Sequence, residues 1–409
     1  MSPELPIAPA AAESAPATLP RNVRLLGLSS LLNDIAGEMI FPLIPAFLIH
    51  VLGASTAALG AVEGVADTTA ALVKLWSGAL SDKAGKRKVF VIAGYALAAL
   101  SRPLIGLATR PWQVLLVRSS DRFGKGIRSA PRDALVADST HPAARGRAFG
   151  FTRSMDHLGA AIGPALAFAF LSVWPDQLRT LFLLTAIPGL LVVLLVVWGL
   201  REQPIASRAA ADFRLTLAPF DRDFRILLLA LVVFTLGNSS DVFLLVRAGE
   251  LGVSERMLPL LWGAFHIVKS AGSLLAGRAV DRFGPRPLIF AGWTIYALIY
   301  LAFSQATTMA EGWGFFLIYG LFYALTEPAE RTLVANLVGA ERKGLAFGWF
   351  NFAIGIAALP SNLLFGWLYE EYGGTVAFAS SAALALAAVC ILAAVGRRTP
   401  RPEGATTVA

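Results

Sequence analysis

Cysteine, histidine and charge are scarce in this sequence, and each shortage excludes a class of structure. The 409 residues include one cysteine, Cys390, so no disulfide can form within the chain. With four histidines and one cysteine, no pair has the spacing of metal ligands on one helix, so we expect no metal site. Charged residues make up 15% of the chain against 56% hydrophobic residues, a balance that excludes a soluble protein of this length.

Sequence motifs for nucleotide use, catalysis and secretion are also missing. No Gly-x-x-x-x-Gly-Lys-(Ser/Thr) loop is present, so ATP is not the expected energy source. No nucleophile with an adjacent base and an orienting acid can be recognised, so we do not expect an enzyme. Residues 1–20 are rich in Ala and Pro and lack the basic start and apolar centre of a secretory signal, which predicts a disordered tail.

Long apolar runs dominate the rest of the chain. A bilayer crossing takes roughly 20 residues, and three runs of this length carry no charge: Thr180 to Leu200, Leu288 to Ala310 and Tyr372 to Gly396. Twelve spans can be drawn, at 23–50, 56–80, 88–109, 112–136, 147–173, 178–200, 224–248, 257–279, 286–308, 312–337, 344–370 and 374–396. The polar interval 201–223 is the predicted linker between an N-terminal bundle (21–200) and a C-terminal bundle (224–396), and 397–409 is a second tail.

The excess of basic residues, 35 Lys and Arg against 27 Asp and Glu, follows the loops. Basic residues gather in alternate loops, for example Lys86 to Lys88 and Arg145 to Arg147, whereas the loops around Gly53, Thr307 and Gly373 have none. Cytoplasmic loops of membrane proteins carry such an excess. The pattern predicts that both termini are cytoplasmic and that the positive charge reflects membrane orientation, with no nucleic-acid partner.

One loop between two spans occurs in both halves of the sequence. Gly78 to Lys88, GALSDKAGKRK, returns as Gly277 to Pro287, GRAVDRFGPRP. Asp281 of the second copy lies 199 residues after Asp82 of the first. A repeat of this kind indicates a duplicated chain.

A second stretch repeats at a distance that matches the first to within one residue. Pro131 to Gly150 returns as Pro328 to Gly348, and Gly344 lies 198 residues after Gly146. Two stretches that share one offset indicate two homologous halves. This is the plan of many secondary transporters, whose substrate site lies near the midplane between the repeats.

The first repeated loop resembles the signature of the major facilitator superfamily between its second and third helices. The second loop resembles the weaker echo between the eighth and ninth helices. The resemblance covers the chain after residue 20. It implies an all-α membrane protein with 12 transmembrane helices in two pseudo-symmetric six-helix bundles, which moves a small molecule by alternating access.

In that family the loop aspartate helps to hold one end of the transporter closed. A carboxylate near a helix N-terminus is favoured by roughly 0.3–1 kcal/mol. The resemblance also implies that Lys86 reaches an acid at the end of the fourth span, here Asp138. Pro285 and Asn336 occupy the equivalent positions of the second half, so we expect a weaker ionic contact there. The candidate gate residues of the repeats are Gly78, Asp82, Gly85, Lys86, Asp138, Gly277, Asp281 and Gly284.

The fifth span carries a further motif of the gate. Gly159-x-x-x-Gly163-Pro164 resembles an element typical of the family's proton-linked exporters, although Ala167 and Phe168 replace the glycine pair that normally follows. Small residues also let any two helices approach closely. The motif therefore indicates either export or simple helix packing.

Acidic residues within the first two spans are the main candidates for proton transfer. An ionisable residue near the bilayer centre costs on the order of 3 kcal/mol, so it is a functional candidate by default. Asp34 and Glu38 are four residues apart and share one helical face. We expect Glu38 and Asp67 to carry protons, followed by Asp34 and Asp241, because carboxylates in a low dielectric can titrate near neutral pH. A hard-cation site formed by Asp34, Glu38 and Asp67 is the alternative.

The fourth span is unusual in carrying five basic residues on one stripe. Arg118, Arg122, Lys125, Arg128 and Arg132 (the basic stripe) are spaced by three or four residues. One interpretation is an internal ion-pair ladder with the carboxylates of the first two spans. The other is a switchable network in which protonation of a carboxylate frees its basic partner. Arg128 and Arg132 are expected at the cytoplasmic interface, with no special role.

Two histidines complete the set of ionisable residues in the spans. His157 and His266 could titrate, although hydrogen-bonded packing is the simpler expectation. The candidates for proton coupling and for the substrate cavity are Asp34, Glu38, Glu63, Asp67, Arg118, Arg122, Lys125, Asp156, His157, Asp241, His266, Lys269 and Glu327.

These features leave two transport functions open. The motif of the fifth span and the acidic first two spans favour proton-coupled export (antiport) of a drug, metabolite, siderophore or metal species through a bacterial inner membrane. The basic stripe favours import of an organic anion, and a membrane sensor without transport is a third alternative. In each case we expect a monomer in the lipid bilayer, with a small-molecule ligand, no cofactor and energy from the proton gradient.

Overall fold

The computed structural model describes residues 18–44, 47–53, 56–203, 215–239, 241–253 and 257–395. Within those ranges the side chains of 49–50, 56–68, 71, 242 and 258–259 are not described. The two predicted tails and most of the predicted linker lie outside the described residues, at 1–17, 204–214 and 396–409. Their disorder therefore stays a prediction.

The N-terminal half consists of helices that cross the molecule six times. The first pass comprises α1 (Arg21–Glu38), η1 (Phe41–Leu43) and η2 (Phe47–Val51). The next three are α3 (Thr56–Ala84), α4 (Lys88–Leu104) with η3 (Ile105–Leu107), and α5 (Pro111–Asp138). A short η4 (Pro142–Ala144) leads into α6 (Arg145–Val173), and the sixth pass comprises α7 (Leu178–Leu184), α8 (Ala186–Leu194) and η5 (Leu195–Gly199).

The C-terminal half repeats this plan. Its first pass comprises α9 (Arg222–Gly237) and α10 (Asp241–Glu250), followed by α11 (Leu258–Phe283), α12 (Pro285–Gln305) and α13 (Met309–Leu337). After η6 (Ala340–Arg342), α14 (Lys343–Ala393) makes the last two passes, which are separated by a non-helical residue at Gly373 with φ 82° and ψ 169°. The prediction of twelve spans in two groups of six is confirmed for the described chain.

Glycine fixes the turn in both copies of the repeated loop. Gly85 has a φ of 61° and Gly284 a φ of 80°. Residues with a Cβ atom rarely adopt such positive values, whereas glycine adopts them readily. The repeated glycine is therefore needed for the backbone turn between two consecutive passes, independently of any part in gating.

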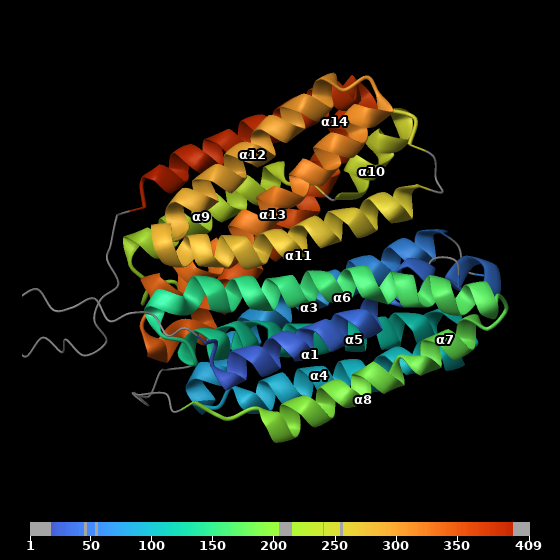
Figure 1. The fold of residues 1–409 in the computed structure, drawn as a ribbon, viewed down its shortest axis with the longest axis horizontal. Helices are drawn as coiled ribbons and strands as arrows, with labels where there is room; N and C mark the ends of the chain where they lie inside the picture. The colour runs from blue at the N-terminus through green and yellow to red at the C-terminus, as the bar shows by residue number, and fades with distance from the viewer. Residues whose placement is uncertain are drawn as a thin grey trace, which may run out of the picture.

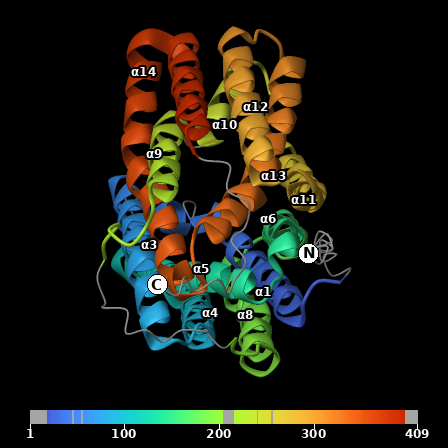
Figure 2. The ribbon, with the colours of Figure 1, turned by 90° about the vertical axis from the view of Figure 1, so that its left-hand side faces the viewer.

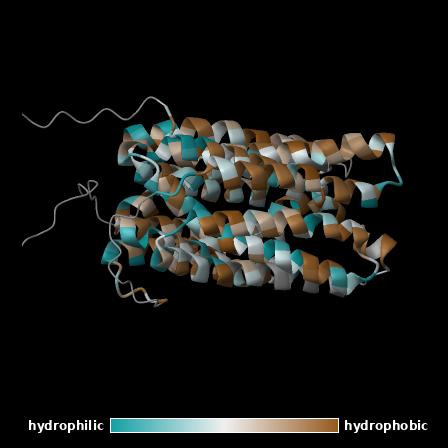
Figure 3. Ribbon diagram, turned by 90° about the horizontal axis from the view of Figure 1, so that it is seen from below, coloured by the Kyte–Doolittle hydropathy of each residue, from teal (hydrophilic) through white to brown (hydrophobic). Residues whose placement is uncertain are grey.

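The outer surface of the bundle is apolar, as a lipid-facing surface must be. Five segments, 88–107, 142–173, 178–199, 285–305 and 340–393, are long and apolar enough to cross a membrane by length and composition alone. Large apolar side chains are exposed on several helices, among them Leu100, Phe168, Trp198, Leu275 and Leu363. Figure 3 shows hydrophobic residues along the helices and hydrophilic residues gathered near their ends.

The two halves form two bundles that lie side by side (Figures 1 and 2). Across the boundary between them, α3 packs against α14 and α6 packs against α11. Consecutive passes alternate in direction. The start of α1 therefore lies at the same side of the molecule as the last residues of α3, α11 and α14, and we call this side the terminal end. The pairs α3 with α11 and α6 with α14 are equivalent by the repeat, so the two contacts between the bundles are related by pseudo-symmetry.

Candidate functional site

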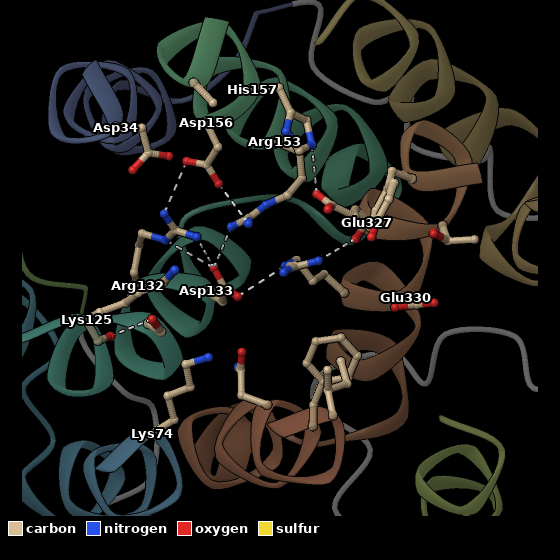
Figure 4. Close-up of a pocket in the computed structure, with 18 of the residues that line it drawn as sticks. Asp34, Lys74, Lys125, Arg132, Asp133, Arg153, Asp156, His157, Glu327 and Glu330 are labelled. Carbon is tan, nitrogen blue, oxygen red and sulfur yellow. Dashed lines mark hydrogen bonds and ion pairs between the residues drawn. The ribbon is translucent and has the colours of Figure 1, made fainter. Parts of the chain in front are cut away.

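A cavity of about 420 Å³ lies between the two bundles and is lined by both of them. Its walls come from α1, α3, α5 and α6 on one side and from α9, α11, α13 and α14 on the other. Figure 4 shows the charged side chains of Lys74, Lys125, Arg132, Asp133 and Glu327 directed into this space. The cavity is the place where the transporter plan predicts a substrate site.

The cavity is highly charged but balanced. Its described lining includes the carboxylates Asp34, Glu38, Asp133, Asp156, Glu327 and Glu330 and the bases Lys74, Lys125, Arg128, Arg132, Arg153 and Arg331. Seven of the residues predicted for coupling or the cavity line it: Asp34, Glu38, Lys125, Asp156, His157, His266 and Glu327. Arg118, Arg122, Asp241 and Lys269 are not in its lining, and the side chains of Glu63 and Asp67 lie outside the described residues.

Asp133 joins three arginines at the boundary between the bundles. Its Oδ1 atom lies 3.2 Å from Arg132 Nη2 and 3.4 Å from Arg153 Nη2, both in the N-terminal bundle. Its Oδ2 atom lies 3.3 Å from Arg331 Nε, which belongs to α13 of the C-terminal bundle. Asp133 is 3% exposed, so these contacts form in a medium that screens charge poorly. Asp156 also pairs with one of these arginines, since its Oδ2 atom lies 2.7 Å from Arg153 Nη1.

The contact between Asp133 and Arg331 follows from the sequence repeat. The two residues are 198 positions apart, the same offset that relates Gly146 to Gly344. They therefore occupy equivalent positions of the two halves, but with opposite charge. The two copies of the repeat thus each supply one partner of an ion pair that crosses the pseudo-symmetry axis.

A second polar contact crosses the same boundary. His157 Nε2 on α6 lies 3.2 Å from Glu327 Oε2 on α13. The His157 ring is also 5.7 Å from that of His266, centroid to centroid. The expectation of a hydrogen-bonded histidine is met at His157, and its partner comes from the opposite bundle.

The basic stripe divides between two environments. Lys125, Arg128 and Arg132 line the cavity, which corrects the expectation that Arg128 and Arg132 belong to the cytoplasmic interface. Because α5 runs along the boundary between the bundles, its C-terminal half faces the cavity. Arg118, nearer the opposite end, lies 3.5 Å from Asp121 Oδ2 within the N-terminal bundle.

Part of an ion-pair ladder is present among the described side chains. Arg102 Nε and Arg118 Nη1 both approach Asp121, at 2.8 and 3.5 Å. Arg132 Nη1 lies 3.4 Å from Asp156 Oδ1. These acids belong to α5 and α6. The side chains of Glu63 and Asp67 on α3 lie outside the described residues, so pairing of the stripe with the first two spans stays a prediction. Because α5 carries both acidic and basic residues, the attraction between them offsets part of the free-energy cost of burying their charges.

Asp241 and Lys269 form a cluster beside the cavity with two tyrosines. Tyr319 donates to Asp241 Oδ1 at 2.7 Å, and Tyr323 donates to the same atom at 3.0 Å. Lys269 Nζ lies 3.6 Å from the centroid of the Tyr323 ring, within the range of a cation–π contact. Tyr323 lines the cavity, so it links this cluster to the substrate space. Sequence analysis missed both tyrosines, because no charge marks the run in which they lie.

The glycine motif of α6 packs against α1 at its two acidic residues. A Cβ atom at Gly159 would lie 3.0 Å from Asp34 Cβ, and one at Gly163 would lie 3.0 Å from Glu38 Cβ and 2.8 Å from the Ile35 carbonyl oxygen. The motif is therefore a close helix contact, and that contact positions the acids that line the cavity.

Gly163→Val is predicted to push α1 away from α6 and to lower both stability and transport. Overpacking of this kind costs about 1–3 kcal/mol, which we expect to appear as a lower melting temperature of the purified protein. Gly263→Val is the matched control, because a Cβ atom at Gly263 on α11 has no neighbour within 4 Å. Equal melting temperatures for the two variants would contradict the close contact.

At the terminal end, the first repeated loop joins α3 to the start of α14 (the first latch: Asp82, Arg87, Asp138, Lys343 and Gly344). Asp82 Oδ1 accepts a hydrogen bond from the Gly344 backbone N–H at 3.0 Å, and Oδ2 accepts one from Leu345. These N–H groups belong to the first turn of a helix, which favours a carboxylate. Lys343 Nζ lies 3.1 Å from Asp138 Oδ1 and adds an ion pair between the bundles.

The expectation for Lys86 is corrected by its neighbour. Arg87 Nε lies 2.6 Å from Asp138 Oδ2, and Arg87 Nη1 lies 2.8 Å from Asp82 Oδ1. Arg87 is buried, whereas Lys86 is exposed. After the turn at Gly85, the side chain of Arg87 is directed toward the two acids, and that of Lys86 is not.

The second repeated loop forms the equivalent contact between α11 and α6 (the second latch: Asp281, Arg147, Arg145 and Asn336). Asp281 Oδ2 accepts from the Arg147 backbone N–H at 3.2 Å and from its Nε at 2.7 Å. Arg145 donates to Asn336 Oδ1 at 2.9 Å, where the first latch has the pair of Lys343 with Asp138. The second latch thus has a hydrogen bond to an amide where the first has an ion pair, but the contact of Arg147 with Asp281 adds an ion pair of its own. The relative strength of the two latches stays a prediction.

Glycines from the repeats let the helices of each latch touch. A Cβ atom at Gly78 would collide with the carbonyl oxygen of Gly344, and one at Gly146 would lie 2.6 Å from that of Gly277. All four positions were singled out in the sequence, where they appear as two equivalent pairs. The bundles are therefore in direct backbone contact at the terminal end.

Comparison with known proteins places these features in a family. The sequence profile described as Major Facilitator Superfamily matches residues 26–246 and again 226–408. An uncharacterized MFS-type transporter of Methanocaldococcus jannaschii is 31% identical over 358 residues, covering 86% of this chain and 89% of the relative. The multidrug resistance protein MdtH of Baumannia cicadellinicola is 26% identical over 349 residues, covering 81% and 80%. The crystal structure of the human organic anion transporter MFSD10 has the same fold, with a TM-score of 0.78 and 19% identity over 91% of this chain and 99% of that one.

Proposed function

Because the chain belongs to the Major Facilitator Superfamily and is a multi-pass membrane transporter, not an enzyme, we propose that it exports a small molecule in exchange for protons. In this proposal the protein lies in the inner membrane with both ends of the chain in the cytoplasm. The basic loops of the terminal end support that orientation. A relative named for multidrug resistance supports efflux.

The observation that carries the proposal is the position of Asp34 and Glu38. Both carboxylates line the cavity between the bundles, together with Lys125 and Arg128. A proton bound to either acid removes one negative charge from this space and so changes the field on the neighbouring bases. A substrate that contacts the same acids competes with the proton, and such competition is the minimum requirement for exchange.

The two latches supply the conformational part of the cycle. They join the bundles at the terminal end, so in the proposed orientation this is the state closed to the cytoplasm. Protons then arrive from the outside, bind the cavity acids and alter the contacts of Asp133 and Glu327 across the boundary. The bundles part at the terminal end, protons leave to the cytoplasm and substrate enters. A transporter whose two states differ by a few kcal/mol can be driven in this way.

Import of an organic anion has less support from the cavity. Its six described Lys and Arg side chains are matched by six carboxylates, so the wall offers no excess of positive charge to an anion. Transport assays separate the two directions. In everted vesicles with an acidic interior, export by exchange accumulates a substrate from a growth screen inside the vesicles. Uptake by intact cells that collapses with the gradient would instead show import.

Glu38→Gln is predicted to reduce gradient-driven transport at least tenfold. The amide keeps the size of the side chain but cannot bind or release a proton, so the link between proton flux and substrate flux is lost. Transport is measured in proteoliposomes with and without a pH gradient. Glu371→Gln, at an exposed position near the turn at Gly373, is the control and should transport normally. Full gradient-driven transport by Glu38→Gln and by Asp34→Asn would remove both acids from coupling.

A further inference from the structure

Three arginines gather on the surface of the N-terminal bundle at the terminal end, where α1 packs against η5. Arg21 and Arg24 are exposed and three residues apart, which makes them neighbours on the surface of α1. Arg201, which is also exposed, donates from its backbone N–H to Asn22 Oδ1 at 3.0 Å, and its carbonyl oxygen accepts from Asn22 Nδ2 at 2.8 Å. These two bonds bring Arg201 to the turn of α1 that carries the other two arginines. We call Arg21, Arg24 and Arg201 the arginine cluster.

An apolar surface with an exposed tryptophan continues from the arginine cluster along the outside of the bundle. A Cβ atom at Gly199 would lie 3.0 Å from Leu25 Cδ1, so η5 and α1 are in close contact here. Trp198 is 76% exposed, and Leu28, one turn further along α1 than Arg24, is exposed as well. Figures 1 and 2 show α1 and α8 side by side on this surface. Tryptophan is enriched where lipid headgroups meet the acyl chains, so the cluster lies at the depth of the headgroups.

The charge of the arginine cluster is not balanced by neighbouring acids. Within the part of the chain that the structure describes, none of its three guanidinium groups has a carboxylate partner. Glu202, the acid next to Arg201, is occupied elsewhere, because its two oxygens accept from the backbone N–H groups of Arg87 and Lys88 at 2.9 and 3.0 Å. The cluster therefore presents three positive charges to the membrane surface.

The start of the second half lacks this excess of charge. Residues 21–24, RNVR, open α1, and residues 222–225, RDFR, open α9. Asp223 stands where the first copy has Asn22, and Arg225 donates to a backbone carbonyl oxygen at 3.1 Å. The preference of basic residues for cytoplasmic loops explains the arginines of both copies. It does not explain why an acid accompanies them in one copy and an amide, which holds a third arginine, in the other.

We propose that the arginine cluster and the apolar surface at Trp198 bind an anionic phospholipid of the leaflet at the terminal end. Guanidinium groups match the oxygens of a phosphate in geometry and charge, and the acyl chains lie along Trp198 and Leu28. A soluble anion would leave the apolar surface uncovered, and a zwitterionic lipid would bring its own cation against the cluster. Basic pockets between membrane helices bind anionic headgroups in this way. The inference goes beyond the proposed function, since it needs neither a direction of transport nor a coupling ion.

Fluorescence quenching of Trp198 by brominated lipids tests the site in the full-length protein. The protein is placed in phosphatidylcholine nanodiscs that contain a varied fraction of brominated phosphatidylglycerol or, in a parallel series, of brominated phosphatidylcholine. The chain has nine tryptophans, so the difference from a Trp198→Phe variant isolates the signal of Trp198. Because each basic residue near an anionic headgroup adds attraction, we expect phosphatidylglycerol to bind at least tenfold more tightly than phosphatidylcholine.

A matched pair of variants separates this site from a general effect of net charge. Arg21→Gln with Arg24→Gln should lower the preference for phosphatidylglycerol at least fivefold, whereas Arg222→Gln with Arg225→Gln removes the same charge at the start of α9 and should change it less than twofold. Arg201→Gln serves as the second test if the first double variant does not fold.

Three outcomes would overturn the proposal. Equal quenching by the two brominated lipids in the unaltered protein would show that the surface does not select anionic lipid. An equal loss of preference in the two double variants would show that net charge alone acts. Displacement of brominated phosphatidylglycerol by soluble glycerol 3-phosphate would show that the arginines bind any phosphate and that the apolar surface contributes nothing.

Discussion

Asp133→Asn is expected to abolish transport and to lower the free energy of unfolding by about 3–5 kcal/mol, the cost of breaking a buried ion pair from one side. Asp133 is 3% exposed and is shared by Arg132, Arg153 and Arg331. The asparagine side chain removes the one negative charge that these three guanidinium groups have in common. Their mutual repulsion then acts in a poorly screened interior.

The effect of Arg331→Gln is expected to be smaller than that of Asp133→Asn. Arg331 is one of three cations on Asp133, so its removal leaves the carboxylate with Arg132 and Arg153. For the same reason the exchanged pair, Asp133→Arg with Arg331→Asp, should not recover transport, because it places three arginines of one bundle together. Thermal unfolding of the purified variants and transport in proteoliposomes measure this order. Equal effects of the two single variants, or recovery in the exchanged pair, would show that Asp133 acts through Arg331 alone.

Gly78→Leu is expected to open the terminal end and to reduce transport at least tenfold while the fold persists. The new side chain would collide with the Gly344 carbonyl oxygen, where α3 touches α14. Overpacking by about 1–3 kcal/mol is comparable to the difference between two transporter states, and every 1.4 kcal/mol changes their ratio tenfold. The collision with Gly344 is relieved when the bundles part, whereas a 3.2 Å contact with Ala130 Cβ of the same bundle remains, so the larger part of the cost falls on closure.

Spin-label distances measure closure of the first latch directly. Labels are attached to Ala84→Cys at the end of α3 and Arg342→Cys in η6, both exposed, in a Cys390→Ser background. Gly78→Leu should lengthen the main distance. Gly314→Leu, where a Cβ atom has no neighbour within 4 Å, is the control for the loss of a helical glycine. A distance that is the same in both variants would mean that the glycine contact does not determine which state the protein adopts.

The fold could be predicted from the sequence because its signals are local. Apolar runs of the length of a bilayer gave the twelve passes, and the repeated loops gave the two halves. The turn glycines Gly85 and Gly284 and the contact glycines Gly78 and Gly277 fell within the repeats. These features need no knowledge of how distant helices meet.

The details of the site depend on how distant helices meet, and here the predictions were less complete. Lys86 and Arg87 are adjacent bases, and only the direction of the chain after Gly85 decides which one reaches Asp138. The depth of Arg128 and Arg132 depends on the course of α5 along the other bundle. Tyr319 and Tyr323 carry no charge and gave no signal. The contact of Asp133 with Arg331, however, was readable in principle, since an offset of 198 joins two residues of opposite charge.

That offset also limits how the halves can relate to each other. Two identical halves would bring the same residue from both sides to the centre, and aspartate would then face aspartate, or arginine would face arginine. An ion pair at equivalent positions can exist only between copies that have already diverged. Replacing either half by a duplicate of the other would therefore keep the twelve passes but lose the ion pair between Asp133 and Arg331. For this reason a symmetric dimer of one half is not expected to replace the fused chain.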